Sequence, residues 1–225
     1  MRTKALLLTA ALGLASVATS MAQVYSVNVV GYVNLDLKTG FNLVASQLNA
    51  TPDNKIVSVL PSVQNNTQLL KFSNNNYTRD DFSVADGGWL DSETLEPSVR
   101  TVSPGEGFFM YSPAPATVTL VGEVRTGNNL TVPLPTGFSL ISSIVPQDLA
   151  LSPAGSAFPV AQNMQFLSWN ATAQGYNLRL DFDSGIWINS ETLDEVPAPQ
   201  VTVGQGFFIY SPGPSSWVRS FNPNN

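Results

Sequence analysis

Apolar residues in this chain fall into short runs separated by turn-forming residues. The runs at 41–45, 108–111, 138–142 and 207–210 each follow a glycine, and Ser-Pro follows two of them. Runs of this length, with Gly and Pro at their boundaries, are typical of β-strands. The continuously apolar runs at 108–111 and 207–210 predict strands that are buried on both faces. We therefore predict an all-β chain with no helix of any length.

The pattern of strands and turns occurs twice. Four blocks recur in the same order 97 to 99 residues later: 40–46 as 137–143, 68–72 as 165–169, 89–95 as 187–193, and 105–113 as 204–212. The drift in spacing indicates a duplication with small loop insertions. We predict two tandem homologous modules, 23–124 and 125–225, each a small β-sandwich or barrel.

Three further segments flank the repeated blocks. Residues 27–33 resemble residues 118–124, and residues 217–221 fall at the equivalent place after the second unit. We interpret these segments as strands that close each unit at both ends. On this interpretation the strand at 118–124 also serves as the junction between the units.

The first 22 residues have the features of a signal peptide. Arg2 and Lys4 precede an apolar run at 5–17, and Ser20-Met21-Ala22 supplies small residues for cleavage. The run is shorter than the ~20 residues needed to span a bilayer. We expect cleavage after Ala22, no transmembrane anchor in the mature chain, and a secreted product that is extracellular, periplasmic or at the cell surface.

The composition removes several classes of function. The chain has no cysteine, so a disulfide-free core must stabilise each module, and it has no histidine. Histidine-dependent nucleophilic sites and the usual zinc, haem and copper sites are therefore excluded. Without residues 1–22 the chain has 8 basic and 16 acidic residues, a net charge of −8. This acidic balance, without a basic cluster, disfavours nucleic acid as a partner.

The repeated motifs resemble those of uncharacterised exported bacterial tandem β-module proteins. The resemblance rests on G-F-N-L-V at 40–44, G-F-S-L-I-S-S-I-V-P-Q at 137–147 and G-E-G-F-F at 105–109. It covers nearly the whole mature chain, as two modules. It implies small β-sandwiches or barrels outside the cell and brings no catalytic residues, because the shared motifs are core strands.

Acidic residues offer two kinds of candidate site. Paired carboxylates could serve a hydrolase, but only Asp81/Asp181 and Glu93/Glu191 align between the repeats, and acids on solvent-facing turns explain the pattern. Asp181, Asp183 and Glu191 are candidates for a Ca²⁺ site because Asp-x-Asp-x-Gly spaces carboxylates as calcium loops do. An ordinary Asx-turn explains this segment equally well. We expect no other cofactor.

Aromatic residues are the remaining candidates. Trp89 and Trp187 each precede a turn, where an exposed indole could stack on a sugar ring; alternatively, both are duplicated core anchors. Tyr77 and Tyr176 lie in hairpin-like runs and are further candidates for ligand binding.

These observations favour a non-enzymatic extracellular protein with a structural, adhesion or surface-associated role. Cell-surface components or polysaccharide are the expected partners. The first alternative is a carbohydrate-binding protein that uses the tryptophans, and the second is a carboxylate-based hydrolase.

Overall fold

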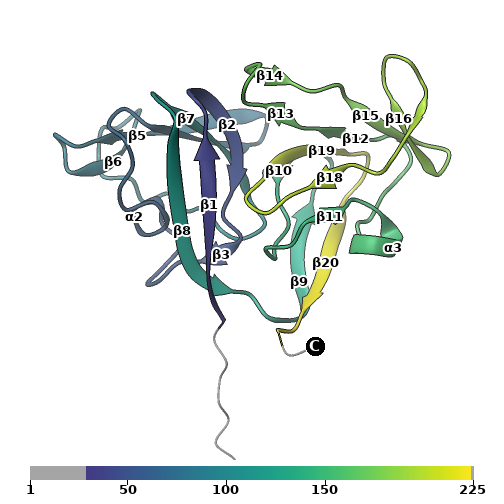
Figure 1. The fold of residues 1–225 in the computed structure, drawn as a ribbon, viewed down its shortest axis with the longest axis horizontal. Coiled ribbons are helices and arrows are strands. Elements are labelled where there is room, and N and C mark those ends of the chain that lie inside the picture. Colours follow the sequence, from purple (N-terminus) through teal and green to yellow (C-terminus); the bar gives the residue numbers. More distant parts are fainter. Residues whose placement is uncertain (1–28, 224–225) are drawn as a thin grey trace, which may run out of the picture.

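The computed structural model describes residues 29–223, so the expected signal peptide lies outside the described residues. The fold is all-β, as predicted (Figure 1). The helices in the described part of the chain are two single turns, α2 (Ile56–Val59) and α3 (Pro153–Ser156). Within residues 29–223, no helix is long and apolar enough to cross a membrane.

The first half (29–124) contains a five-stranded antiparallel sheet and a smaller three-stranded one. The strand order of the larger sheet is β2 (Gly40–Ala45), β7 (Gly107–Ser112), β4 (Gln68–Ser73), β5 (Asn76–Ser83), β6 (Gly88–Asp91). In the smaller sheet the order is β1 (Val30–Leu37), β8 (Ala116–Val124), β3 (Leu48–Asn49). The smaller sheet packs on the larger one, and together they enclose a core.

The second half (125–223) has a corresponding strand order. Its six-stranded sheet runs β10 (Gly137–Ile141), β19 (Phe207–Ser211), β12 (Met164–Leu167), β15 (Leu180–Asp183), β16 (Ile186–Asn189), β17 (Glu195–Val196). Three strand pairs complete it: β9 (Gly127–Leu134) with β20 (Ser215–Phe221), β11 (Leu149–Ala150) with β18 (Gln200–Val201), and β13 (Trp169–Asn170) with β14 (Gly175–Tyr176).

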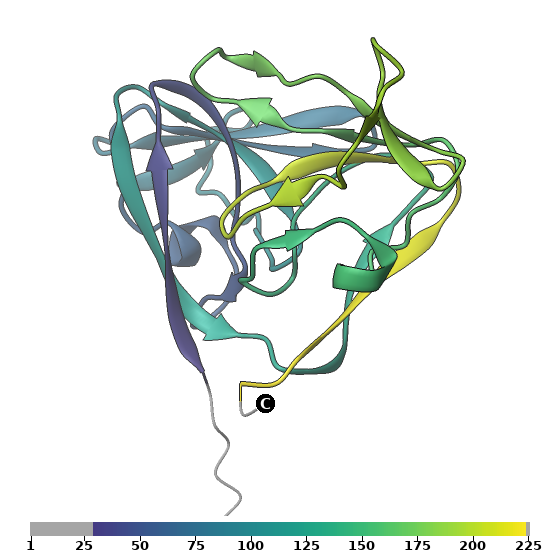
Figure 2. The same ribbon diagram turned by 45° about the vertical axis from the view of Figure 1, so that its right-hand side comes forward.

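The interpretation of 118–124 as a strand shared by both halves is wrong. This segment belongs to β8, whose strand partners are β1 and β3 of its own half. The second half begins with a strand of its own, β9, which pairs with β20 (Figures 1 and 2). The buried residues of β9, Leu130, Val132 and Leu134, alternate with outward-facing residues as in a half-buried strand, but Pro133 interrupts this signal because proline is unusual inside a strand.

A third apolar cluster joins the two halves. Phe109 of β7 and Phe208 of β19 meet there together with Leu43 and Leu140. The neighbouring residues Phe108, Met110, Phe207 and Ile209 instead point into the core of their own half. The prediction that these strands are buried on both faces is confirmed, since one face covers the core and the other face covers the opposite half.

The backbones of the two halves contact each other reciprocally. Ala45 N–H donates to Gly204 O (2.9 Å), and the corresponding Ser142 N–H donates to Gly105 O (3.0 Å). Each contact thus occurs twice with the halves exchanged, as at a two-fold interface. Gly206 is required for this approach, because a Cβ there would lie 2.6 Å from Val44 O.

We expect Trp217→Ala to destabilise the protein by about 3–5 kcal/mol, the usual cost of truncating a core aromatic residue. Trp217 of β20 is fully buried against Phe158, and its indole N–H donates to Ser156 O (2.8 Å). Urea denaturation measures the change. Val218→Ala, at an exposed position of the same strand, should change stability by less than about 0.5 kcal/mol. A Trp217→Ala loss below about 1 kcal/mol would contradict the assigned packing.

Candidate functional site

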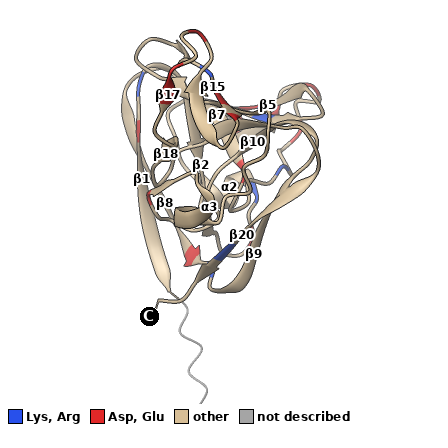
Figure 3. Cartoon of the chain, turned by 90° about the vertical axis from the view of Figure 1, so that its right-hand side faces the viewer, with Lys and Arg blue, Asp and Glu red and all other residues tan. Residues whose placement is uncertain are grey.

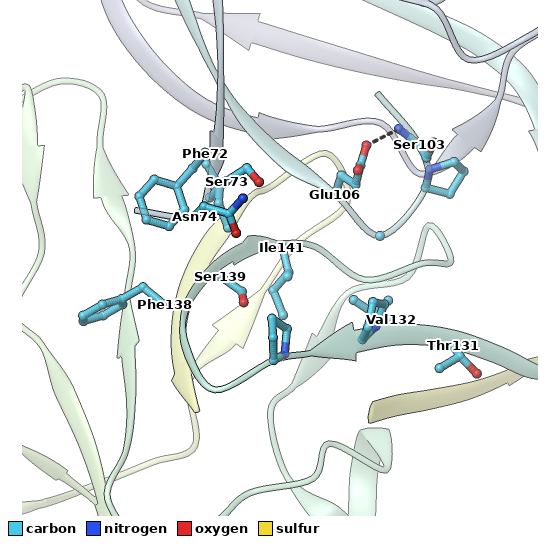
Figure 4. Close-up of a pocket in the computed structure, with 15 residues that line it drawn as sticks. Phe72, Ser73, Asn74, Ser103, Glu106, Thr131, Val132, Phe138, Ser139 and Ile141 are labelled. Atoms are coloured by element: carbon cyan, nitrogen blue, oxygen red, sulfur yellow. Dashed lines mark hydrogen bonds between the residues drawn. The ribbon is translucent and has the colours of Figure 1, made fainter. Parts of the chain in front are cut away.

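A hollow lies where the two halves meet. We call it the junction cleft; it has a volume of about 470 Å³ and is lined by residues 72–74, 103–106, 131–133, 135 and 138–141. The first two segments come from the first half, and the others come from β9, β10 and the turn between them in the second half (Figure 4). A cavity of this size suits a small ligand or a short piece of a polymer.

Aromatic rings form one end of the cleft. A shallower depression of about 240 Å³ shares Phe72 and Phe138 with it and is otherwise lined by Tyr77, Leu167, Tyr176 and Phe208. We call this set the aromatic shelf. Phe72 packs edge-on against Phe208, with ring centroids 5.1 Å apart. Phe138 is 41% exposed and lies beside Phe72 in Figure 4, so the shelf presents ring surface to solvent.

Tyr77 and Tyr176 meet on the shelf, although 99 residues separate them. They are 44% and 48% exposed. Partial burial and, next, hydrogen bonding with the Tyr176 hydroxyl raise the pKa of Tyr77 above its ordinary value. The Tyr77 hydroxyl is therefore neutral at physiological pH and can donate or accept hydrogen bonds. The structure thus brings together two of the residues that the sequence singled out.

Polar groups line the other end of the cleft. The Glu106 carboxylate accepts a hydrogen bond from Ser103 N–H (2.7 Å) and pairs with Lys71 Nζ (3.0 Å). Lys71 also donates to Thr101 O (2.6 Å), so both side chains are held in place. Elsewhere in the chain the charged residues occur as short, scattered segments (Figure 3). The cleft therefore combines apolar rings with hydroxyl, amide and carboxylate groups.

The corresponding place on the other side of the junction is filled. There, Trp169 Nε1 donates to Phe41 O (2.8 Å), and its ring packs edge-on against Phe109. The Gln174 carboxamide accepts from Phe41 N–H (2.7 Å) and donates to Phe41 O (3.0 Å). In the repeat, Phe41 corresponds to Phe138 and Trp169 to Phe72. The junction of the halves thus has two corresponding places: one is filled by Trp169 and Gln174, and the other is the open junction cleft.

The two tryptophans proposed as sugar platforms are core residues. Trp89 and Trp187 are each 4% exposed, and their indole N–H groups donate to Leu60 O (2.8 Å) and Leu151 O (3.3 Å). Their ring faces are covered by core side chains, so the duplicated-anchor alternative describes them. The hypothesis that Trp89 and Trp187 stack on sugar rings is therefore wrong.

The candidate calcium residues do not form a binding group. Asp181 pairs with Arg179 (2.9 Å), Asp183 bonds to Gln162 and Ser184, and Glu191 lies on the exposed turn after Asn189. Over residues 29–223, no cluster of three or more acidic side chains could hold a metal ion. The turn interpretation accounts for these residues, and the calcium hypothesis is not supported by their geometry.

Comparisons with known proteins give no match: no family model, curated protein or solved structure matches this chain. The candidate site therefore rests on the geometry of the chain itself. Sequence reasoning missed Phe72, Glu106 and Phe138 as site residues. The sequence contains one signal, a difference in spacing between the repeats: Tyr77 lies five positions after Phe72, whereas Tyr176 lies seven positions after Trp169.

Proposed function

We propose that this chain is an exported, non-enzymatic adhesion or surface-binding protein that recognises carbohydrate in the junction cleft. It is built from two duplicated β-modules, and the cleft lies between them. The observation that supports this function is the difference between the two sides of the junction: Trp169 and Gln174 fill one side, whereas the other side is open and lined with exposed rings.

The lining of the cleft suits a sugar better than an apolar ligand. The flat faces of sugar rings stack on aromatic side chains, and their hydroxyls need hydrogen-bonding partners. The aromatic shelf supplies the rings, and Ser73, Asn74, Thr131 and Ser139 supply side-chain hydroxyl and amide groups along the cleft. A polysaccharide outside the cell is a ligand of this chemistry.

Tryptophan fluorescence tests the proposal, because one tryptophan reports on the cleft. Trp169 packs against Tyr176 of the shelf at 5.1 Å, whereas Trp89, Trp187 and Trp217 are buried in the two cores. We expect soluble oligosaccharides to shift the emission of the mature protein, and we expect Trp169→Phe to abolish the shift while binding by calorimetry persists.

Retention on insoluble glycans gives a second measurement. Tyr77→Ala/Tyr176→Ala should weaken retention about tenfold or more, because stacking on aromatic side chains is lost. Tyr32→Ala is the matched control, since Tyr32 is a more exposed tyrosine on β1, outside the cleft lining. If no oligosaccharide shifts the emission and no glycan retains the protein, carbohydrate is rejected as the ligand.

A further inference from the structure

The closed side of the junction shows how a ligand can be held on the open side. β2 is the outer strand of its sheet, so no strand of the described residues pairs with the outer side of the backbone at Phe41. The Gln174 carboxamide takes the place of a neighbouring strand by bonding both the N–H and the C=O of Phe41. An adjacent donor and acceptor on one small group, together with the Trp169 indole N–H, therefore close this edge.

Phe138 has the same backbone position on the open side. Phe138 of β10 pairs with Tyr210 of β19, as Phe41 of β2 pairs with Tyr111 of β7. Like β2, β10 is the outer strand of its sheet. Ser142 N–H points away from β19, since it donates to Gly105 O. Alternate residues of a strand direct their N–H and C=O to the same side, so those of Phe138 point outward as well. Among residues 29–223, no side chain hydrogen-bonds to the N–H and C=O of Phe138 as Gln174 does to those of Phe41.

The lengths of two hairpins explain why one edge is capped and the other is not. β4 and β5 are joined by Asn74 and Asn75 alone, both with positive φ (51° and 60°), which is a tight two-residue turn. β13 and β14 are joined by the four residues 171–174, the last of which is Gln174. The shorter hairpin therefore has no residue that corresponds to the capping glutamine.

We propose that the N–H and C=O of Phe138 bind a pair of neighbouring hydroxyl groups on a neutral sugar, whose ring stacks on the aromatic shelf. Each hydroxyl both donates and accepts, so a vicinal diol offers a donor and an acceptor side by side, as the Gln174 carboxamide does. This inference rests on the proposed function and specifies the chemical group that is recognised. Uronic acids are disfavoured because the chain is acidic overall and the residues that line the cleft include no Lys or Arg.

A peptide strand fits the open edge less well than a sugar. Strand addition gains its affinity from a series of main-chain hydrogen bonds along an exposed edge. Here the edge is blocked soon after Phe138, because Ile141 is bridged to Glu106 and Ser142 is bonded to Gly105. A small group with two bonding atoms is therefore favoured over an extended chain.

A loop graft tests the assignment of Phe138. Residues 73–76 are replaced by the sequence of residues 170–175, Asn-Ala-Thr-Ala-Gln-Gly, so that the new glutamine caps Phe138. We expect the affinity for cellotriose, measured by calorimetry, to fall at least about 30-fold. The same graft with alanine at its glutamine is the matched control. Both grafts replace Ser73 and Asn74 alike, so the glutamine graft should bind cellotriose much more weakly than this control.

A pair of point variants tests the backbone donor independently of the loop. Phe138→Ala removes the ring, whereas Phe138→Pro removes the ring and the N–H at an outer strand position that tolerates proline. We expect Phe138→Pro to bind cellotriose about tenfold more weakly than Phe138→Ala, the effect of one lost hydrogen bond. Equal affinities for both variants, or an unchanged affinity in the glutamine graft, would overturn the role of Phe138 and leave the proposed function standing.

Failure of the proposed function has a different signature. No binding of cellotriose or xylotriose to the unmodified protein up to about 10 mM would reject both proposals. A synthetic peptide of residues 168–177 supplies the natural cap; if it binds in the cleft and the sugars do not, the cleft is a peptide site and both proposals are overturned.

Discussion

Replacing Arg100 by methionine should destabilise the protein by about 3–5 kcal/mol, because it leaves a buried carboxylate without its partner. Asp80 is fully buried in β5, and its Oδ2 accepts from Arg100 Nε at 2.6 Å. Arg100 also pairs with Asp91 Oδ2 at 2.5 Å, so one guanidinium bridges two carboxylates. For a chain of this length the expected loss lowers the Tm by roughly 10–15 °C, which calorimetry measures.

The second half of the chain supplies the matched control for this experiment. Leu180 stands there at the position of Asp80, and Pro199 stands at the position of Arg100, so the duplicate manages without the ion pair. The double variant Asp80→Leu/Arg100→Met should therefore recover most of the lost stability, as replacement of a buried pair by apolar residues commonly does. If the double variant were less stable than Arg100→Met alone, the unpaired carboxylate would not be the cause.

Most of the strand content could be predicted from the sequence because local pattern determines it. Phe108 and Phe109, like Phe207 and Phe208, are adjacent apolar residues, and in a strand such a pair requires both faces to be buried because successive side chains point to opposite faces. The pattern does not say what covers each face. That the second face of β7 is covered by β19 of the other half follows from tertiary packing, which no local period encodes.

The candidate site was predictable only in part. Tyr77 and Tyr176 were chosen from their hairpin context, and the structure places both on the aromatic shelf. Trp89 and Trp187 were weighed between surface and core, because a tryptophan before a turn is compatible with either position until its neighbours are known. Phe138 could not be found from the sequence, since what distinguishes it from Phe41 is the absence of a cap supplied by a distant hairpin.

Sequence repetition also obscures the difference between the halves that matters for the candidate site. A duplication draws attention to what recurs, and here the recurring residues are mostly core strands. The junction cleft arises instead from a difference of two residues between corresponding hairpins. In a duplicated protein, a length difference of this kind at the interface between the copies is therefore the more informative signal for a binding site.

Gly206→Ala is expected to destabilise the contact between the two halves by about 1–3 kcal/mol, the range for overpacking a close contact. The backbone of Gly206 is not in the left-handed region, so the substitution introduces no conformational strain of its own. The cost comes from space alone: a Cβ at Gly206 would lie 2.6 Å from Val44 O and 3.2 Å from Gly107 Cα. Both neighbours are backbone atoms, so relief requires the halves to move apart.

Gly213→Ala separates the effect of space from the effect of the residue change. A Cβ at Gly213 meets no atom within 4 Å, and its backbone is also outside the left-handed region, so this variant should match the unmodified protein within about 0.5 kcal/mol. Urea denaturation followed by near-ultraviolet circular dichroism reports the stability of both variants. Separation of the halves also widens the junction cleft, so Gly206→Ala should weaken oligosaccharide binding while Gly213→Ala does not. Equal stability and equal binding in the two variants would show that the close approach at Gly206 does not set the spacing of the halves.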